Sequence, residues 1–183
     1  MLRGKELWLA LLVIVFVTIV YGGFFVWMRQ IPRASDFFGH ALGVLGFLLM
    51  LMTEMLYSLR KRSRSARWGK MSSWLEFHIF TGLVGPYLVL LHTSWKFNGL
   101  AGVTTLFTLI IVISGFIGRY IYTRIPRTVQ GTEIQGVLPE ATLRQARRLL
   151  ALWHDIHIPI GVVLFLLAFV HIGAALYYAT FLK

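Results

Sequence analysis

Two histidine pairs with the same spacing are the residues of this chain whose type and position indicate chemistry. His78 and His92 lie fourteen residues apart in one apolar segment. His157 and His171 have the same separation in another. Fourteen residues of α-helix advance about 21 Å and complete almost four turns, so both imidazoles of a pair share one helix face. Each helix therefore offers one ligand near each surface of a membrane.

If the two helices lie side by side and run in the same direction, the histidines meet at two levels. His78 would face His157 at one level, and His92 would face His171 at the other. Two such sites stacked across a bilayer are the arrangement that holds two b-type haems. An iron with two axial histidines keeps no open position, so such haems carry electrons rather than bind oxygen.

The composition places these histidines in a membrane. Hydrophobic residues make up 57% of the 183 residues and the mean hydropathy is +0.73, which leaves too little polar surface for an ordinary soluble domain. A spanning helix needs about 20 mainly apolar residues. The sequence predicts one all-α domain, residues 1–183, with five transmembrane helices at roughly residues 7–28, 40–59, 74–93, 103–122 and 156–178.

The first apolar segment has some features of a signal peptide, because Arg3 and Lys5 precede it. However, its apolar run is about twenty residues long, which is longer than the apolar region of a signal peptide. No small-residue cleavage site precedes Arg29. We therefore expect a retained transmembrane helix.

Basic residues set the expected orientation. If five helices alternate, thirteen basic residues fall on one side of the membrane, namely Arg3, Lys5, Arg60, Lys61, Arg62, Arg64, Arg67, Lys70, Arg124, Arg127, Arg144, Arg147 and Arg148. Four fall on the other side, namely Arg29, Arg33, Lys96 and Lys183. The positive-inside rule predicts a multi-pass protein with its N-terminus inside and its C-terminus outside, and we expect a prokaryotic cytoplasmic membrane. The net charge of +11 reflects this orientation and contact with anionic lipid, not nucleic acid binding.

The same topology makes the third and fifth helices parallel. His78 and His157 then lie on the cytoplasmic side, and His92 and His171 on the opposite side. The ligand levels therefore match, although the spacing alone would be equally consistent with antiparallel helices.

The two histidine segments also resemble each other. HIFTGLVGPYLVLLH and HIPIGVVLFLLAFVH share His, Ile, Gly, Leu and His at the same offsets. Gly82 and Gly161 each lie four residues after the inner histidine, on the face that would bind haem. A missing side chain there would let a flat macrocycle approach the backbone, and the alternative is ordinary close packing of helices.

Other metal sites fit the sequence less well. The chain contains no cysteine, which excludes covalent c-type haem attachment and iron–sulfur ligation. A zinc or copper site needs ligands that converge on one ion. A separation of about 21 Å prevents the two histidines of one helix from meeting at one ion.

The paired His-x13-His motifs resemble the membrane domain shared by ferric reductases, NADPH oxidases and related di-haem cytochromes b. The resemblance covers the third to fifth spans well and the first two loosely. It implies that His78 and His157 ligate an inner haem, that His92 and His171 ligate an outer haem, and that electrons pass between the membrane faces. Members often add flavin and nicotinamide domains, but no Gly-rich dinucleotide fingerprint follows a strand here. The chain would therefore depend on redox partner subunits.

His40 and Glu54 are candidates for a quinone or proton site. His40 begins the second span at a depth close to His92, and it could cap the helix, bind a quinone or transfer a proton. Glu54 lies fourteen residues further along the same face. An intramembrane carboxylate is functional by default, although this one could instead reach Arg60.

Basic residues near the ends of the spans are candidates for contacts with haem propionates. Arg119, near the inner end of the fourth span, is the best inner candidate because an unpaired charge there would be costly. Lys96 and Arg33 are outer candidates, and all three could instead be interfacial anchors. His154 precedes His157 by three residues and lies off the ligand face, so we expect an interfacial or propionate contact.

Residues 139–152 predict a basic amphipathic helix on the cytoplasmic membrane surface. Its arginines would contact lipid or a soluble electron-transfer partner. The whole sequence predicts a di-haem b-type cytochrome that carries electrons across the membrane as the anchor subunit of a larger oxidoreductase. A quinol-oxidising or quinone-reducing subunit with its site near His40 is one alternative. A non-redox membrane scaffold is the alternative from another class.

Overall fold

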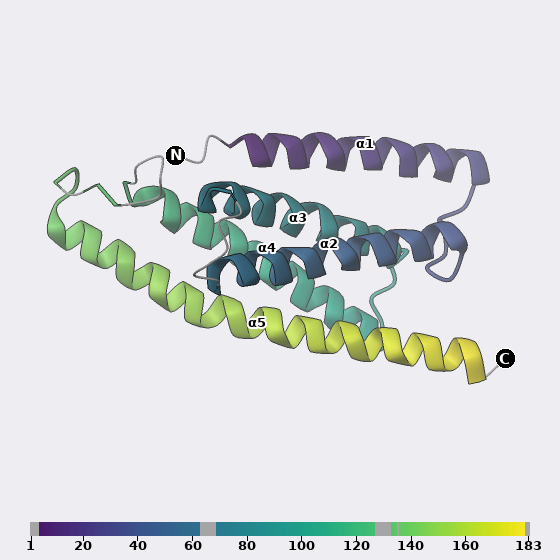
Figure 1. Cartoon of the computed structure of the whole chain (residues 1–183). Helices are drawn as coiled ribbons and strands as arrows, with labels where there is room; N and C mark the ends of the chain where they lie inside the picture. Colours follow the sequence, from purple (N-terminus) through teal and green to yellow (C-terminus); the bar gives the residue numbers. More distant parts are fainter. Residues whose placement is uncertain (1–3, 63–68, 127–132, 135, 182–183) are drawn as a thin grey trace. The chain divides into compact units, whose positions relative to one another are not determined.

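The computed structural model describes residues 4–62, 69–126, 133–134 and 136–181 (Figure 1). Within these ranges it contains five helices and no strand: α1 (Lys5–Met28), α2 (Phe37–Arg62), α3 (Met71–His92), α4 (Gly99–Arg124) and α5 (Glu140–Phe181). All five helices are long and apolar enough to cross a membrane. The prediction of an all-α fold with five such helices is confirmed. Five of the basic residues used to predict the orientation lie outside the described residues, namely Arg3, Arg64, Arg67, Arg127 and Lys183.

Helix α5 differs from the sequence prediction, which had separate helices at residues 139–152 and 156–178. It is one helix of 42 residues with Pro159 inside it. Its length is about 63 Å, roughly twice the thickness of the hydrocarbon core of a bilayer. The basic segment is therefore an extension of the fifth spanning helix, and its continuity is visible in Figure 1.

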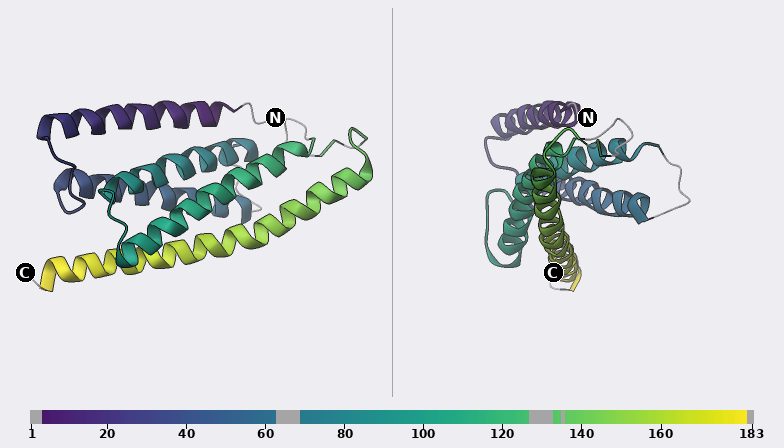
Figure 2. Two further views of the ribbon diagram at one scale, coloured as in Figure 1. Left: turned by 180° about the vertical axis from the view of Figure 1, so that it is seen from behind. Right: turned by 90° about the vertical axis from the view of Figure 1, so that its left-hand side faces the viewer.

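The described residues belong to two compact units. The first unit, Met1–Trp95 with Pro126–Leu138, contains α1, α2 and α3. In it, α3 packs against both α2 and α1, and the buried core consists of Ala10, Leu42, Val84, Leu88 and Leu91. The second unit, Lys96–Ile125 with Pro139–Lys183, is an antiparallel pair of helices, α4 and α5 (Figure 2).

Close packing of α2 against antiparallel α3 depends on two glycines. A Cβ atom on Gly46 would lie 2.7 Å from the carbonyl oxygen of Gly85, and a Cβ on Gly85 would lie 2.9 Å from that of Gly46. One helical turn or more away, the Thr53 hydroxyl donates a hydrogen bond of 2.6 Å to the Thr81 hydroxyl. Small residues and hydrogen bonds between helices are the interactions that hold helices together in lipid.

Replacing Gly46 with alanine should separate α2 from α3 and destabilise the first unit. Forcing an extra carbon into a closely packed contact costs about 1–3 kcal/mol, and the melting temperature measured by circular dichroism in detergent should fall. Gly22→Ala on α1 is the matched control, because a Cβ there meets no atom within 4 Å. Equal melting temperatures for the two variants would contradict the proposed role of Gly46.

Candidate functional site

Each histidine pair lies on one uninterrupted helix. His78 and His92 are on α3, and His157 and His171 are on α5. The helix is therefore continuous between the two histidines in both units, as the prediction that they share one face requires. All four side chains are half-buried.

His78 is held by the neighbouring helix through Nδ1. This nitrogen lies 3.3 Å from the backbone carbonyl oxygen of Thr53 on α2. A carbonyl oxygen only accepts hydrogen bonds, so Nδ1 carries the proton and donates. The aromatic ring of Tyr57 lies beside the imidazole, with 4.8 Å between the ring centroids.

His92, the last residue of α3, is held in the same way at the other end of α2. Its Nδ1 donates a hydrogen bond of 2.8 Å to the carbonyl oxygen of Gly39. A Cβ on Gly43 would lie 2.8 Å from two atoms of this imidazole, so the glycine leaves the space that the ring occupies. Gly39 and Thr53 are themselves fourteen residues apart. Helix α2 therefore presents one carbonyl acceptor to each histidine of α3.

His157 is held in the second unit by a hydroxyl. Its Nδ1 lies 2.9 Å from Oγ of Ser114 on α4. The indole of Trp153, one turn earlier on α5, stacks on the imidazole with a centroid distance of 4.7 Å and an interplanar angle of 30°. The Trp153 Nε1–H donates to the Ser114 carbonyl oxygen at 2.7 Å. A Cβ on Gly118 would overlap the indole ring, so this glycine makes room for Trp153.

The hydrogen bonds of His78 and His92 determine the tautomer of both imidazoles. In His78 and His92 the proton is on Nδ1, and Nε2 is then the nitrogen with the lone pair. Ligating histidines in metalloproteins usually have this arrangement, in which the second ring nitrogen donates to a carbonyl or another acceptor. The imidazoles on α3 are thus in the tautomer that an axial ligand requires.

Gly82 and Gly161 differ from Gly46 and Gly118 in the space that is available for an added Cβ atom. A Cβ on Gly82 would lie 3.7 Å from Cγ2 of Thr53, and one on Gly161 would lie 3.9 Å from Cδ1 of Ile111. These are ordinary van der Waals distances. Packing within the described residues therefore does not require a glycine at either position, in contrast to Gly46 and Gly118.

The remaining candidates have ordinary contacts in the structure. The exposed His40 places Nδ1 3.3 Å from the carbonyl oxygen of Ala34, and its ring meets that of His92 edge to face with a centroid distance of 6.2 Å. Glu54 is exposed and accepts a hydrogen bond from Ser58. These contacts neither require nor exclude roles in quinone binding or proton transfer, which stay predictions.

Four basic side chains were predicted as candidates for contacts with haem propionates, namely Arg119, His154, Lys96 and Arg33. Arg119 is half-buried on α4. His154 lies 3.8 Å from the carboxylate of the adjacent Asp155. A propionate contact for any of the four stays a prediction.

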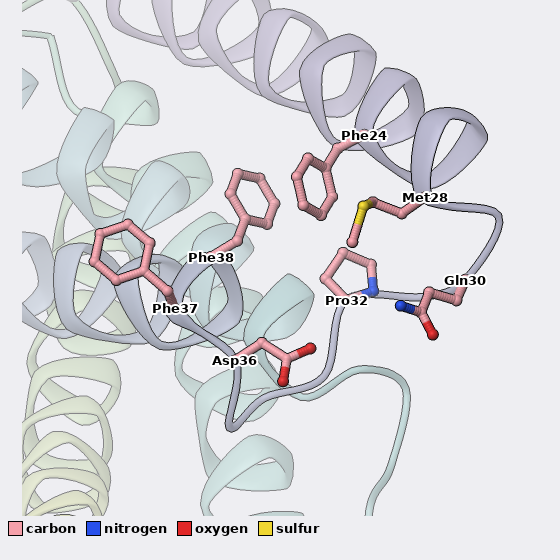
Figure 3. A pocket seen from close by; sticks show the side chains of 7 residues that line it. All are labelled: Phe24, Met28, Gln30, Pro32, Asp36, Phe37 and Phe38. Carbon is pink, nitrogen blue, oxygen red and sulfur yellow. The ribbon is translucent and has the colours of Figure 1, made fainter.

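An apolar pocket, which the sequence did not predict, lies at the connection between α1 and α2 (Figure 3). It has a volume of about 330 Å³ and is lined by Phe24, Met28, Gln30, Pro32, Asp36, Phe37 and Phe38. The rings of Phe24 and Phe38 stack with 4.4 Å between their centroids. Gln30 and Asp36 contribute polar side chains to the lining, and the Asp36 carboxylate also accepts a hydrogen bond from the backbone N–H of Arg33. His40 and Glu54 are not among the lining residues.

The partners of the histidines were missed by the sequence analysis. Ser114, Gly39 and Thr53 lie on the helices opposite, so no spacing within a histidine segment indicates them. The close spacing of glycines in α2 was the one local signal of a close helix approach. Within the described residues, no group of three or more His, Cys, Asp or Glu side chains could share a metal ion. A haem with two axial histidines needs no such group.

Comparisons of the chain with protein-family models, curated proteins and solved structures give no match. The resemblance to ferric reductases and NADPH oxidases is therefore still a prediction from the histidine motifs.

Proposed function

We propose that this protein is a di-haem b-type cytochrome that carries electrons across a membrane, as the anchor subunit of a larger oxidoreductase. His78 with His157 would ligate the inner haem, and His92 with His171 the outer haem. The pairing follows from the spacing on each helix and from an alternating topology with the N-terminus inside. A prokaryotic cytoplasmic membrane is part of the proposal.

The observation that carries the proposal is the hydrogen bond that Nδ1 of His78 and of His92 donates to a carbonyl of α2. Ionisable side chains within spanning segments are costly and usually functional. The hydrogen bond also fixes the ring orientation, and it leaves Nε2 unprotonated for an axial bond. A bound haem would supply a reversible one-electron couple at its iron.

A second support is that packing within the described residues does not require a glycine at position 82 or at position 161. Both glycines share a helix face with the histidine four residues earlier. Since packing does not explain them, we propose that their missing side chains let the macrocycle approach the helix. Arg119 is the candidate for an inner propionate, and Lys96 and Arg33 are candidates for the outer ones.

The N-terminal part of α5 suits a partner subunit. At its first turn, Glu140 pairs with Arg144 and Arg147 at 4.0 and 3.8 Å, in contacts that are largely exposed. Exposed ion pairs of this kind contribute little stability. We propose that the basic segment, with Arg148, attracts an acidic soluble electron-transfer partner, because complementary charge speeds association.

The first test is the haem content of the purified protein. Wild type should contain two low-spin haems per chain, because four axial histidines make two pairs. His92→Ala and His171→Ala should each lose about half of the haem, measured by the pyridine haemochrome assay, since one axial pair is broken. Gln145→Ala, at an exposed position of α5, is the control and should keep both haems.

A wild type that contains one haem or none would refute the pairing. A reduced-minus-oxidised spectrum also separates the proposal from a non-redox membrane scaffold, because a scaffold would show no reducible haem bands.

The second test concerns Gly82 and Gly161. Gly82→Ala and Gly161→Ala should lower haem content, since a methyl group would occupy part of the place of the macrocycle. Neither should lower the melting temperature of the haem-free protein, because a Cβ meets only ordinary contacts at both positions. Haem content equal to wild type in both variants would show that these faces do not adjoin haem.

A quinone-reactive subunit is the second candidate function, and the pocket between α1 and α2 favours it. Its volume of about 330 Å³ lies within the range of small-molecule sites, and its lining is largely apolar, with three phenylalanines and two polar side chains. It adjoins the segment that contains Gly39 and His40, and the Gly39 carbonyl binds His92. A bound quinone would thus lie close to a proposed outer haem ligand.

His40→Ala tests this second function. If His40 participates in quinone chemistry, electron transfer to an added soluble quinone should slow while the haem spectrum stays intact. Unchanged quinone kinetics would indicate a structural role, in line with its contact to the Ala34 carbonyl. Loss of haem in this variant would mean that a ligand has been assigned wrongly.

A further inference from the structure

Ser114 on α4 contacts two aromatic side chains of α5 that lie one helical turn apart, Trp153 and His157. It is only 8% exposed. Its hydroxyl oxygen lies 2.9 Å from Nδ1 of His157, and its carbonyl oxygen accepts the indole N–H of Trp153 at 2.7 Å. Trp153 in turn stacks on His157 and fits against Gly118. The imidazole is therefore held at one nitrogen and along one face.

Other buried hydroxyls of α4 have a different arrangement. Thr104 and Thr108 donate to carbonyl oxygens four residues earlier in their own helix, Leu100 and Thr104 respectively, each at 2.9 Å. That local bond is the usual one for a hydroxyl inside a helix. The Ser114 hydroxyl instead meets a titratable ring of the neighbouring helix.

The Ser114 contact also differs from those of the histidines on α3. His78 and His92 bind backbone carbonyls, which only accept. A serine hydroxyl can accept or donate. If it accepts from Nδ1–H, as the carbonyls must, Nε2 of His157 is the unprotonated nitrogen. Unlike a backbone carbonyl, this partner of Nδ1 can be removed by a substitution.

We propose that Ser114 and Trp153 are positioning residues for His157: the Ser114 hydroxyl accepts a hydrogen bond from Nδ1–H and so fixes the tautomer, and Trp153 restricts rotation of the ring. The inference deepens the proposed function, because it concerns His157 as an axial ligand. An acceptor at Nδ1 makes a ligating imidazole more basic. A more basic ligand favours the ferric state, so Ser114 should lower the midpoint potential of the haem that His157 binds, and of that haem only.

The test compares Ser114→Ala with Ser114→Thr, which keeps a hydroxyl, and with Thr108→Ala, which removes another buried hydroxyl of α4. In a potentiometric titration, Ser114→Ala should shift the midpoint of one haem upward and leave the other unchanged. Ser114→Thr and Thr108→Ala should both titrate as wild type does. Equal midpoints in Ser114→Ala and wild type would overturn the proposed role of the hydroxyl.

A second measurement does not need haem. In haem-free protein with ¹⁵N-labelled histidine, the imidazole signals assigned through His157→Gln should show Nδ1 protonated in wild type. Ser114→Ala should give a mixture of tautomers. An unchanged Nδ1-protonated signal in Ser114→Ala would refute the inference, whereas a wild type that binds no haem would refute only the proposed function.

Trp153 is tested by the order of the axial ligand. Trp153→Ala should broaden the low-spin electron paramagnetic resonance signal of one haem, because the ring of His157 can adopt several orientations. Trp153→Phe keeps a stacked ring and loses only the N–H donor, so its signal should stay close to wild type. A sharp, unshifted signal in Trp153→Ala would exclude a positioning role for the indole.

Discussion

The constraint on which this structure depends is that a polar group within an apolar span must find its partner inside the protein. An imidazole in such a span is stable only where a neighbouring helix offers an acceptor at the right level. His78 and His92 meet this requirement through two carbonyls of α2, which are separated by the same fourteen residues as the histidines. Gly46 and Gly85 at the contact between α2 and α3 serve the same requirement, because the two helices must approach closely enough for a ring nitrogen to reach a backbone oxygen.

The same solution occurs in both units. In each, the helix with the histidine pair packs against the antiparallel helix that precedes it in the chain. A glycine of the preceding helix makes room for a ring: Gly43 for the imidazole of His92, and Gly118 for the indole of Trp153. The acceptor differs, being a backbone carbonyl in the first unit and the Ser114 hydroxyl in the second. In the proposed function, His157 is therefore the ligand of the inner haem whose orientation and basicity the Ser114 side chain would influence.

An electron carrier of the proposed kind needs rigid ligands more than it needs a substrate cavity. Each hydrogen bond to a ligand nitrogen limits ring rotation and tunes the basicity of the imidazole. Helix α5 is roughly twice as long as the hydrocarbon core of a bilayer is thick, so in the proposed function its basic N-terminal segment would extend beyond the membrane and offer a docking site for a redox partner. Ligand orientation and partner docking would then be properties of one continuous helix.

The sequence by itself determined the five apolar helices and the shared face of each histidine pair, because both follow from local properties: the length of apolar runs and the period of the α-helix. It did not determine the continuity of α5. The polar residues around position 154 and Pro159 indicate a boundary between two helices, but the structure has one continuous helix there. Nor did the sequence indicate Ser114, Trp153 or the pocket between α1 and α2. These features arise only when residues far apart in the chain face each other, and that depends on how helix surfaces pack, which no local spacing encodes.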